Sequence, residues 1–415
     1  MNIFDKCHDY VYADRLKAQG IYPYFKAIQD SDGPEVTISN RKLIMAGSNN
    51  YLGLTTHPRV QEAVIKATEQ YGSSCSGSRF LTGTTVLHEE MEYKLAEFMG
   101  KESALLFTTG YLTAQGVIAP LVGRGEYLFS DKDNHASIAV ANTMTSALNG
   151  KVLRYQHNNM DDLENRLQRV EYDKPKLIVT DGVFSTFGTT ANMRGITRLA
   201  RKYNANVVMD DAHGLGILGP GGKGTAHHFG VEDEVDLTIC TFSKSLASTG
   251  GFVVGDERVI NYLKHNSPAL MFSASPTPAA VAAALTALEI IKESPDLPHK
   301  VLRNARKVRT GLKELGFNLV DSEAAIIAVM LGDNERTFRF WQALYEEGLF
   351  VNAFISPAVR DGEQMLRLSL MATHLDMHLD FILHTFKKIG TRLDVISGTP
   401  ISMALVNNVD RELVA

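Results

Sequence analysis

The sequence is poor in the residues that would mark a disulfide scaffold, a zinc site or a nucleic-acid surface. Its three cysteines, Cys7, Cys75 and Cys240, are too few and too scattered for a disulfide framework, and they indicate a reducing compartment. The 42 Lys and Arg residues do not exceed the 47 Asp and Glu residues, and the formal net charge is -5. Without an excess of positive charge, nucleic acid is not an expected partner.

Long apolar runs are also missing. The longest, Pro278 to Leu288, is too short to span a bilayer and ends at Glu289. The N-terminal residues Met1 to Lys6 lack the apolar centre of a signal peptide. We therefore expect a cytoplasmic protein, and the sequence leaves open whether the C-terminal tail makes a peripheral membrane contact.

What is present is enough apolar material for a large core. The 415 residues are 44% hydrophobic and 21% charged, which predicts roughly two to three domains. We predict an N-terminal arm over residues 1–54, a large domain over 55–290, a small α+β domain over 291–395 and a tail over 396–415. In the arm, Ser39-Asn40-Arg41 reads as the turn of a hairpin.

In the large domain, short apolar runs alternate with helical patterns. This order predicts an α/β fold with a mostly parallel sheet covered on both faces, and ligands bind such sheets at the carboxyl ends of the strands. The predicted strands are Ala104 to Phe107, Tyr127 to Ser130, Leu177 to Thr180, Val207 to Met209, Leu237 to Cys240 and Phe252 to Val254.

Lys244 follows the predicted strand that ends at Cys240, and Asp210 and His213 follow the strand before it. A lysine amine can form a Schiff base with pyridoxal 5'-phosphate (PLP). An aspartate can keep the ring nitrogen of that cofactor protonated, so that the ring accepts electrons. Together these residues predict a PLP enzyme.

Other polar residues at strand ends suit the same cofactor, although each also has an ordinary structural explanation. The amides of Thr109-Gly110-Tyr111 can bind phosphate at a helix start, or can simply form a strand-to-helix turn. Tyr111 or His135 can stack on a flat ring. The hydroxyls of Ser185 and Thr241 suit the cofactor's 3-oxygen and phosphate.

Arg367 stands inside an apolar alternating run and needs an anionic partner if it is buried. That partner can be a substrate carboxylate or an acidic side chain in a structural ion pair, and the sequence does not decide between them. His227-His228 has no third ligand at a sensible spacing, so we predict no metal site. Gly214 to Gly219 matches a dinucleotide fingerprint, but Pro220 follows it in place of a helix.

Five segments occur in the order found in the α-oxoamine synthases, and the chain resembles that family from about residue 10 to 395. These fold-type I PLP enzymes condense an amino acid with an acyl-CoA and release carbon dioxide. The resemblance implies an aminotransferase-like fold, with a mostly parallel central sheet and a smaller C-terminal α+β domain, and a homodimer with shared active sites. The segments are Ser48 to Leu54, Gly77 to Gly83, His135 to Ser137, Asp210 to His213 and Thr241 to Lys244.

Within the family, Phe242 to Phe252 and Leu270 to Pro278 are most similar to bacterial serine palmitoyltransferases. This similarity implies L-serine and palmitoyl-CoA as substrates, with 3-ketosphinganine, the first intermediate of sphingolipid synthesis, as product. Two positions depart from the family: Thr189 stands where an acidic residue is usual, and Gly214 where serine or alanine is usual. The run Ser185 to Thr189 is similar to synthases of α-hydroxyketone autoinducers.

Alternatives therefore remain. Another amino acid, such as alanine, glycine or 2-aminobutyrate, can replace serine in the same chemistry. The chain can also be a non-catalytic partner subunit, although such a scaffold has no need of Lys244.

The resemblance implies a role for each site residue. It makes Lys244, His135, His213 and Asp210 the catalytic group. Lys244 forms the Schiff base and transfers protons, Asp210 pairs with the ring nitrogen, and His213 and Ser185 contact the 3-oxygen. Gly110, Tyr111 and Thr241 hold the phosphate, with Ser273 reaching in from a second subunit, while His135 stacks on the ring and Arg367 and Asn49 bind the amino acid carboxylate.

Overall fold

The computed structural model describes residues 2–396 of the chain, which form two compact units. The large unit comprises residues 49–302 and 322–325, and the small unit comprises the described residues of 1–48, 303–321 and 326–415. The predicted division at residues 54, 290 and 395 remains a prediction. The tail predicted over 396–415 lies, beyond Ile396, outside the described residues.

The large unit is built on a seven-stranded sheet with the order β4-β10-β9-β8-β7-β5-β6. Strand β10 runs antiparallel to β4 and β9, and the other neighbours are parallel, as predicted. The sequence analysis missed β6, whose half-exposed edge position tolerates charged residues within the strand. The strands are β4 (Ser103–Phe107), β5 (Tyr127–Asp131), β6 (Lys151–Tyr155), β7 (Lys176–Asp181), β8 (Asn206–Asp210), β9 (Leu237–Thr241) and β10 (Gly251–Gly255).

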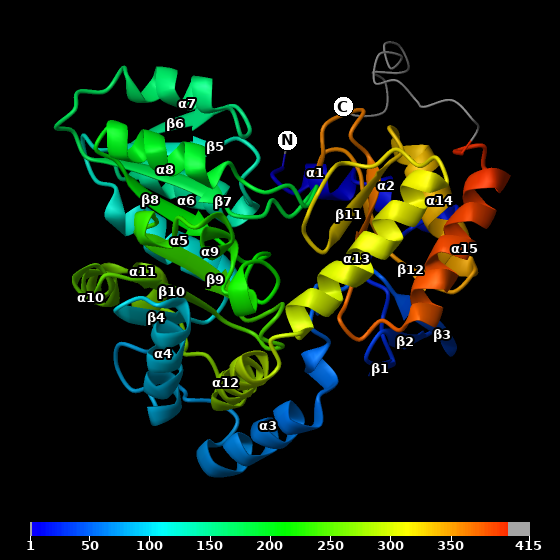
Figure 1. The fold of residues 1–415 in the computed structure, drawn as a ribbon, viewed down its shortest axis with the longest axis horizontal. Helices are drawn as coiled ribbons and strands as arrows, with labels where there is room; N and C mark the ends of the chain where they lie inside the picture. Colours follow the sequence, from blue (N-terminus) through cyan, green and yellow to red (C-terminus); the bar gives the residue numbers. More distant parts are fainter. Residues whose placement is uncertain (1, 397–415) are drawn as a thin grey trace. The chain divides into compact units, whose positions relative to one another are not determined.

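Helices cover both faces of this sheet (Figure 1). Because side chains alternate across a strand, Val208 and Ile239 pack with α5, α6 and α10 on one face. Val207 and Met209 pack with α7, α8 and α9 on the other face. By the same alternation, Asp210 points to the face that carries α5 and α6.

The remaining elements of the large unit are helical. They are η1 (Leu54–Thr56), α3 (Pro58–Tyr71), α4 (Val86–Met99), α5 (Gly110–Leu121), α6 (Ala136–Ala147), α7 (Met160–Leu167), α8 (Met193–Lys202), η2 (Pro220–Gly222), α9 (Thr225–Phe229), η3 (Glu232–Glu234), α10 (Glu257–Asn266), α11 (Pro268–Met271) and α12 (Pro278–Glu293). Helix α13 (Leu297–Glu314) continues into the small unit.

The small unit contains two sheets and has the α+β character expected of it. One has the order β1-β2-β3-β12 and the other β11-β14-β13. The predicted hairpin is confirmed: Ser39 and Asn40 adopt left-handed φ values of 50° and 58°, which suit a tight two-residue turn. The elements are α1 (Asp5–His8), α2 (Tyr12–Ala18), β1 (Asp30–Asp32), β2 (Glu35–Ile38), β3 (Arg41–Met45), β11 (Ile326–Met330), α14 (Asn334–Glu346), β12 (Leu349–Phe350), β13 (Asn352–Phe354), β14 (Met365–Ser369) and α15 (Asp376–Arg392).

Over residues 2–396, no helix combines the length and the apolar character that crossing a membrane requires.

Candidate active site

A cavity of about 310 Å³ lies in the large unit, where β7, β8 and β9 end and helices α5 and α6 begin. This is the edge of the sheet, at the carboxyl ends of the strands, where the sequence predicts ligand binding. Seven of the predicted site residues line this cavity: Gly110, Tyr111, His135, Asp210, His213, Thr241 and Lys244. We refer to it as the strand-end cavity.

The start of α5 fits a phosphate group. The side chain of Thr109 caps the helix by accepting the N–H of Leu112 at 3.2 Å, and the backbone amides of this first turn lie at the cavity. A Cβ on Gly110 would lie only 2.8 Å from Cβ and Oγ1 of Thr241. Glycine is therefore needed for the helix start to approach Thr241 closely, and the pair forms a cradle for an anion.

His135 caps the N-terminus of α6 and is held in one orientation. Its Nδ1 accepts the backbone N–H of Ser137 at 3.2 Å and lies 2.8 Å from the Ser137 hydroxyl. Burial lowers the pKa of His135, the charge of Lys244 lowers it further, and Asp210 opposes the shift. The imidazole is thus neutral with its proton on Nε2, which suits a ring that stacks on an aromatic cofactor.

Asp210 ends β8 and is buried, with 8% of its surface exposed. Its Oδ1 accepts the backbone N–H of Ala212 at 3.1 Å. Burial raises the pKa of Asp210, while the charge of Lys244 and the Ala212 N–H act in the opposite direction. A positively charged ring nitrogen in this cavity would be a natural partner for its carboxylate.

A buried tyrosine connects two of the predicted residues. The hydroxyl of Tyr51 lies 2.7 Å from Nδ1 of His213 and 3.4 Å from Oδ1 of Asn49. Tyr51 is fully buried. Tyr51 belongs to the family segment Ser48 to Leu54, but the sequence predicted no role for it. The only sequence signal for such a role was its position two residues after Asn49.

Four predicted residues, Ser185, Ser273, Arg367 and Asn49, do not line the strand-end cavity. Ser185 lies in the loop after β7, and Ser273 lies between α11 and α12. Arg367 belongs to β14 in the small unit, where it is 4% exposed and its guanidinium lies 5.7 Å from the centre of the Phe354 ring. The roles of all four remain predictions.

Several cavity residues had no predicted role, among them Ser137, Asp181, Ser243 and Thr249. Asp181 is the most unusual of these, because it is a carboxyl group that is only 4% exposed. It ends β7, as Asp210 ends β8.

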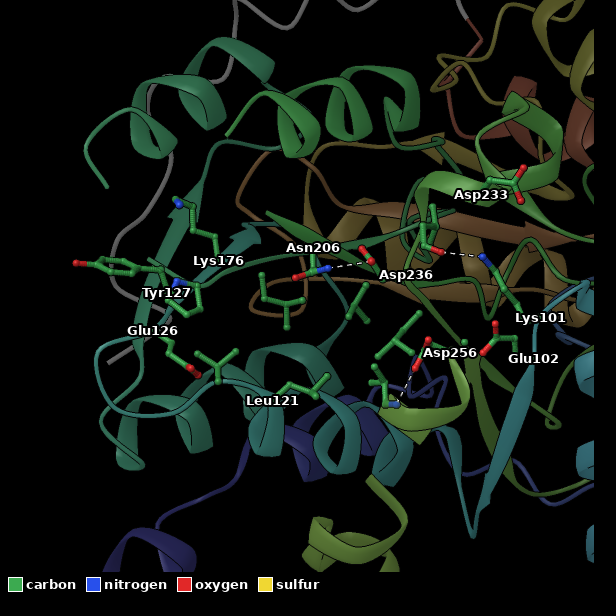
Figure 2. A pocket seen from close by; sticks show the side chains of 18 of the residues that line it. Lys101, Glu102, Leu121, Glu126, Tyr127, Lys176, Asn206, Asp233, Asp236 and Asp256 are labelled. Carbon is green, nitrogen blue, oxygen red and sulfur yellow. Dashed lines mark hydrogen bonds between the residues drawn. The ribbon is translucent and has the colours of Figure 1, made fainter. Parts of the chain in front are cut away.

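A larger cavity, of about 470 Å³, lies at the opposite edge of the sheet, where Tyr127, Lys176 and Leu237 begin their strands (Figure 2). Most of its polar side chains form hydrogen bonds within the protein. Lys101 donates to the carbonyls of Glu232 and Val235, and Asn206 donates to Asp236. None of the predicted site residues lines it, so size does not identify the reactive site here.

The chain matches the family model described as aminotransferase class I and II over residues 41–386. It is 45% identical over 379 residues to a serine palmitoyltransferase (SPT) from Sphingobacterium spiritivorum, a match that covers 90% of this chain and 94% of that relative. It is 38% identical to an 8-amino-7-oxononanoate synthase from Thermoanaerobacter pseudethanolicus, covering 92% of this chain and 96% of the relative.

The fold is also similar to a solved structure of SPT with a PLP internal aldimine. The TM-score is 0.92 at 34% sequence identity, and the match covers 95% of this chain and all of the other.

Proposed function

The chain belongs to the class I and II aminotransferase family as an α-oxoamine synthase, and on that premise we propose that it condenses L-serine with a long-chain acyl-CoA. Palmitoyl-CoA is the favoured acyl donor. The reaction releases carbon dioxide and free CoA and gives an α-amino ketone, 3-ketosphinganine, in the first step of sphingolipid synthesis. The observation that carries this proposal is the strand-end cavity, which brings Lys244 and Asp210 together in a chain similar to SPT.

The residues of the strand-end cavity fit PLP, since the cradle at Gly110 and Thr241 suits a phosphate and Asp210 suits a charged ring nitrogen. When bound, PLP supplies an electron-accepting ring that stabilises negative charge at the α-carbon of the amino acid.

The protein's own residues then bind, orient and move protons. Lys244 holds the cofactor covalently and transfers the proton at the α-carbon. Asp210 holds the proton on the ring nitrogen, and the neutral His135 stacks on the ring and orients the amino acid. His213 contacts the 3-oxygen, with Ser185 as a second contact. Arg367 and Asn49 hold the substrate carboxylate, and Ser273 completes the phosphate site of a partner subunit.

A second candidate is the same chemistry with another amino acid, namely alanine, glycine or 2-aminobutyrate. The similarity to 8-amino-7-oxononanoate synthase and the presence of Thr189 in place of an acidic residue support it. The non-catalytic partner subunit is less favoured because Lys244, Asp210 and His213 are all retained. We further propose that the protein is a cytoplasmic homodimer.

The experiment that tests the proposal uses the purified, PLP-loaded protein. L-serine, alanine, glycine and 2-aminobutyrate are added one at a time, and the visible spectrum of the cofactor is followed. Acyl-CoAs of different length are then added, and the products are identified by mass spectrometry. We expect the largest spectral change and turnover with L-serine and palmitoyl-CoA, and neither with Lys244→Ala. Turnover by Lys244→Ala would contradict the proposal.

A further inference from the structure

Two carboxyl groups lie side by side in the strand-end cavity. Asp181 and Asp210 are register partners on the adjacent parallel strands β7 and β8. Register partners on neighbouring strands project to the same face of a sheet. Both side chains line the cavity, and both are buried, with 4% and 8% of their surfaces exposed.

The two carboxyl groups have different hydrogen bonds. Asp181 accepts the backbone N–H of His135 through Oδ2 at 3.0 Å, and this bond ties the start of α6 to the end of β7. Its Oδ1 is fully buried and has no hydrogen-bond partner within the described part of the chain. Asp210 accepts the Ala212 N–H and has the charge of Lys244 near it.

Two adjacent carboxylates cannot both stay ionised out of water without a large cost, so one of them holds a proton. Burial raises the pKa of Asp181 well above its ordinary value, and the charges of Asp210 and Asp131 add to this, against the His135 N–H and Lys244. Burial raises the pKa of Asp210 as well, but the charge of Lys244 and the Ala212 N–H act against that rise and favour its ionised form. The unpartnered Oδ1 gives the proton a place on Asp181.

We propose that Asp181 is a positioning residue that stays a neutral acid, anchors His135 through Oδ2, and leaves Asp210 as the single carboxylate available to the cofactor's ring nitrogen. The identity of that cofactor rests on the proposed function.

The test is a pH titration of the visible absorbance of the cofactor bound to Lys244, in the complete PLP-loaded enzyme. A nearby negative charge raises the midpoint of this titration, because it stabilises the protonated form of the lysine–cofactor bond. Asp181→Asn keeps the shape of the side chain and removes no charge if Asp181 is neutral. The midpoint of its absorbance titration should therefore lie within about 0.3 pH units of that of the wild type. The matched control Asp210→Asn removes a charge and should lower the midpoint by about one unit or more.

A midpoint in Asp181→Asn lowered as far as in Asp210→Asn would show that Asp181 is ionised and would overturn the inference. If Asp181→Asn does not fold, Asp181→Ala serves the same comparison, because it too removes no charge from a neutral residue. An absent cofactor band in the wild-type protein would contradict the proposed function itself. If the wild-type protein shows the cofactor absorbance but the titration midpoint of Asp181→Asn is lowered, only the role of Asp181 is contradicted.

The anchoring role has its own readout, which is the dissociation constant of PLP. Asp181→Ala removes the acceptor for the His135 N–H, and we expect it to weaken PLP binding by about five- to tenfold, the effect of one lost hydrogen bond. Asp181→Asn keeps an acceptor oxygen and should bind PLP within about twofold of the wild type. Equal PLP affinity in Asp181→Ala and the wild type would overturn the anchoring role.

Discussion

The hydroxyl of Tyr51 lies 2.7 Å from Nδ1 of His213, and this contact joins two segments that are 162 positions apart in the sequence. It holds the His213 ring in one orientation through Nδ1. Tyr51 also lies 3.4 Å from Asn49, a predicted ligand of the substrate carboxylate. The contact therefore links the proposed cofactor site to the proposed amino acid site.

Tyr51→Phe should lower kcat/KM by about three- to tenfold, because a buried hydrogen bond is typically worth about 0.5–1.5 kcal/mol. The ring stays in place, so we expect the fold and bound PLP to be retained. Steady-state kinetics and the absorbance of the bound cofactor measure these two effects. Tyr93→Phe, at a tyrosine that is 67% exposed, is the control and should behave as the wild type. An unchanged kcat/KM in Tyr51→Phe would mean that the contact does not position His213.

Gly214 lies in a closed, buried site that has no room for a side chain. The buried carboxylate of Asp211 accepts the backbone N–H of Thr225 at 2.7 Å and its hydroxyl at 2.5 Å. A Cβ on Gly214 would overlap Oδ1 of Asp211 and Oγ1 of Thr225. The glycine thus leaves room for the hydrogen-bonded pair of Thr225 and Asp211, the residue that follows Asp210.

Gly214→Ala should lower the free energy of unfolding by about 1–3 kcal/mol, the usual cost of overpacking a closed core site. Denaturant unfolding of the PLP-loaded protein measures it. Gly123→Ala is the matched control, since the nearest atom to its added Cβ, Oε2 of Glu126, lies 3.5 Å away. Equal stability of the two variants would show that Asp211 and Thr225 can move to accept the added methyl group. The steric account of Gly214 would then be wrong.

Arg367→Ala should weaken amino acid binding by about ten- to a hundredfold, because a guanidinium–carboxylate contact is typically worth about 1.5–3 kcal/mol. Cofactor content and acyl-CoA affinity should change little. The spectral change on adding L-serine measures the amino acid affinity. Loss of cofactor with unchanged serine affinity would instead make Arg367 a structural residue, and Asn49 would be the next candidate.

His88 should make the protein sensitive to acid. The side chain is fully buried, with Nδ1 accepting the Thr85 N–H and Nε2 lying 3.0 Å from the Pro276 carbonyl. Burial, aided by the charge of Arg79, lowers the pKa of His88 from 6.5 to about 4. The unfolded chain therefore binds a proton before the folded chain does, and stability falls as the pH drops from 6.5 towards 4.

His88 should lower the free energy of unfolding by roughly 3 kcal/mol as the pH falls from 6.5 to 4. In His88→Gln the free energy of unfolding should therefore depend less on pH, and its difference from the wild type should shrink as the pH falls. Denaturant unfolding at several pH values measures this. His8→Gln, at an exposed histidine, should retain the wild-type pH dependence. An equally steep pH dependence in His88→Gln would contradict the assignment.

The sequence predicted the sheet well because the buried strands carry uninterrupted apolar runs, such as Val207 to Met209 in β8. It missed β6, since an edge strand that contains Lys151 and Arg154 has no such run. It predicted the strand-end cavity because polar residues at the carboxyl ends of parallel strands must meet at one rim.

Sequence reasoning did not single out Asp181, because an aspartate after an apolar run looks like any polar strand end. Its significance depends on the register that pairs it with Asp210 and on the burial of Oδ1, which only the structure gives. The contact of Tyr51 with His213 likewise requires two distant segments to be placed together.

The most direct test of the central claim is the stoichiometry of the reaction with carboxyl-labelled L-serine and palmitoyl-CoA. The account predicts that one labelled carbon dioxide and one free CoA appear for each 3-ketosphinganine formed, and that release of the label requires both the acyl-CoA and Lys244. A contradiction would be condensation with another amino acid but not with serine, or free CoA appearing without loss of the serine carboxylate.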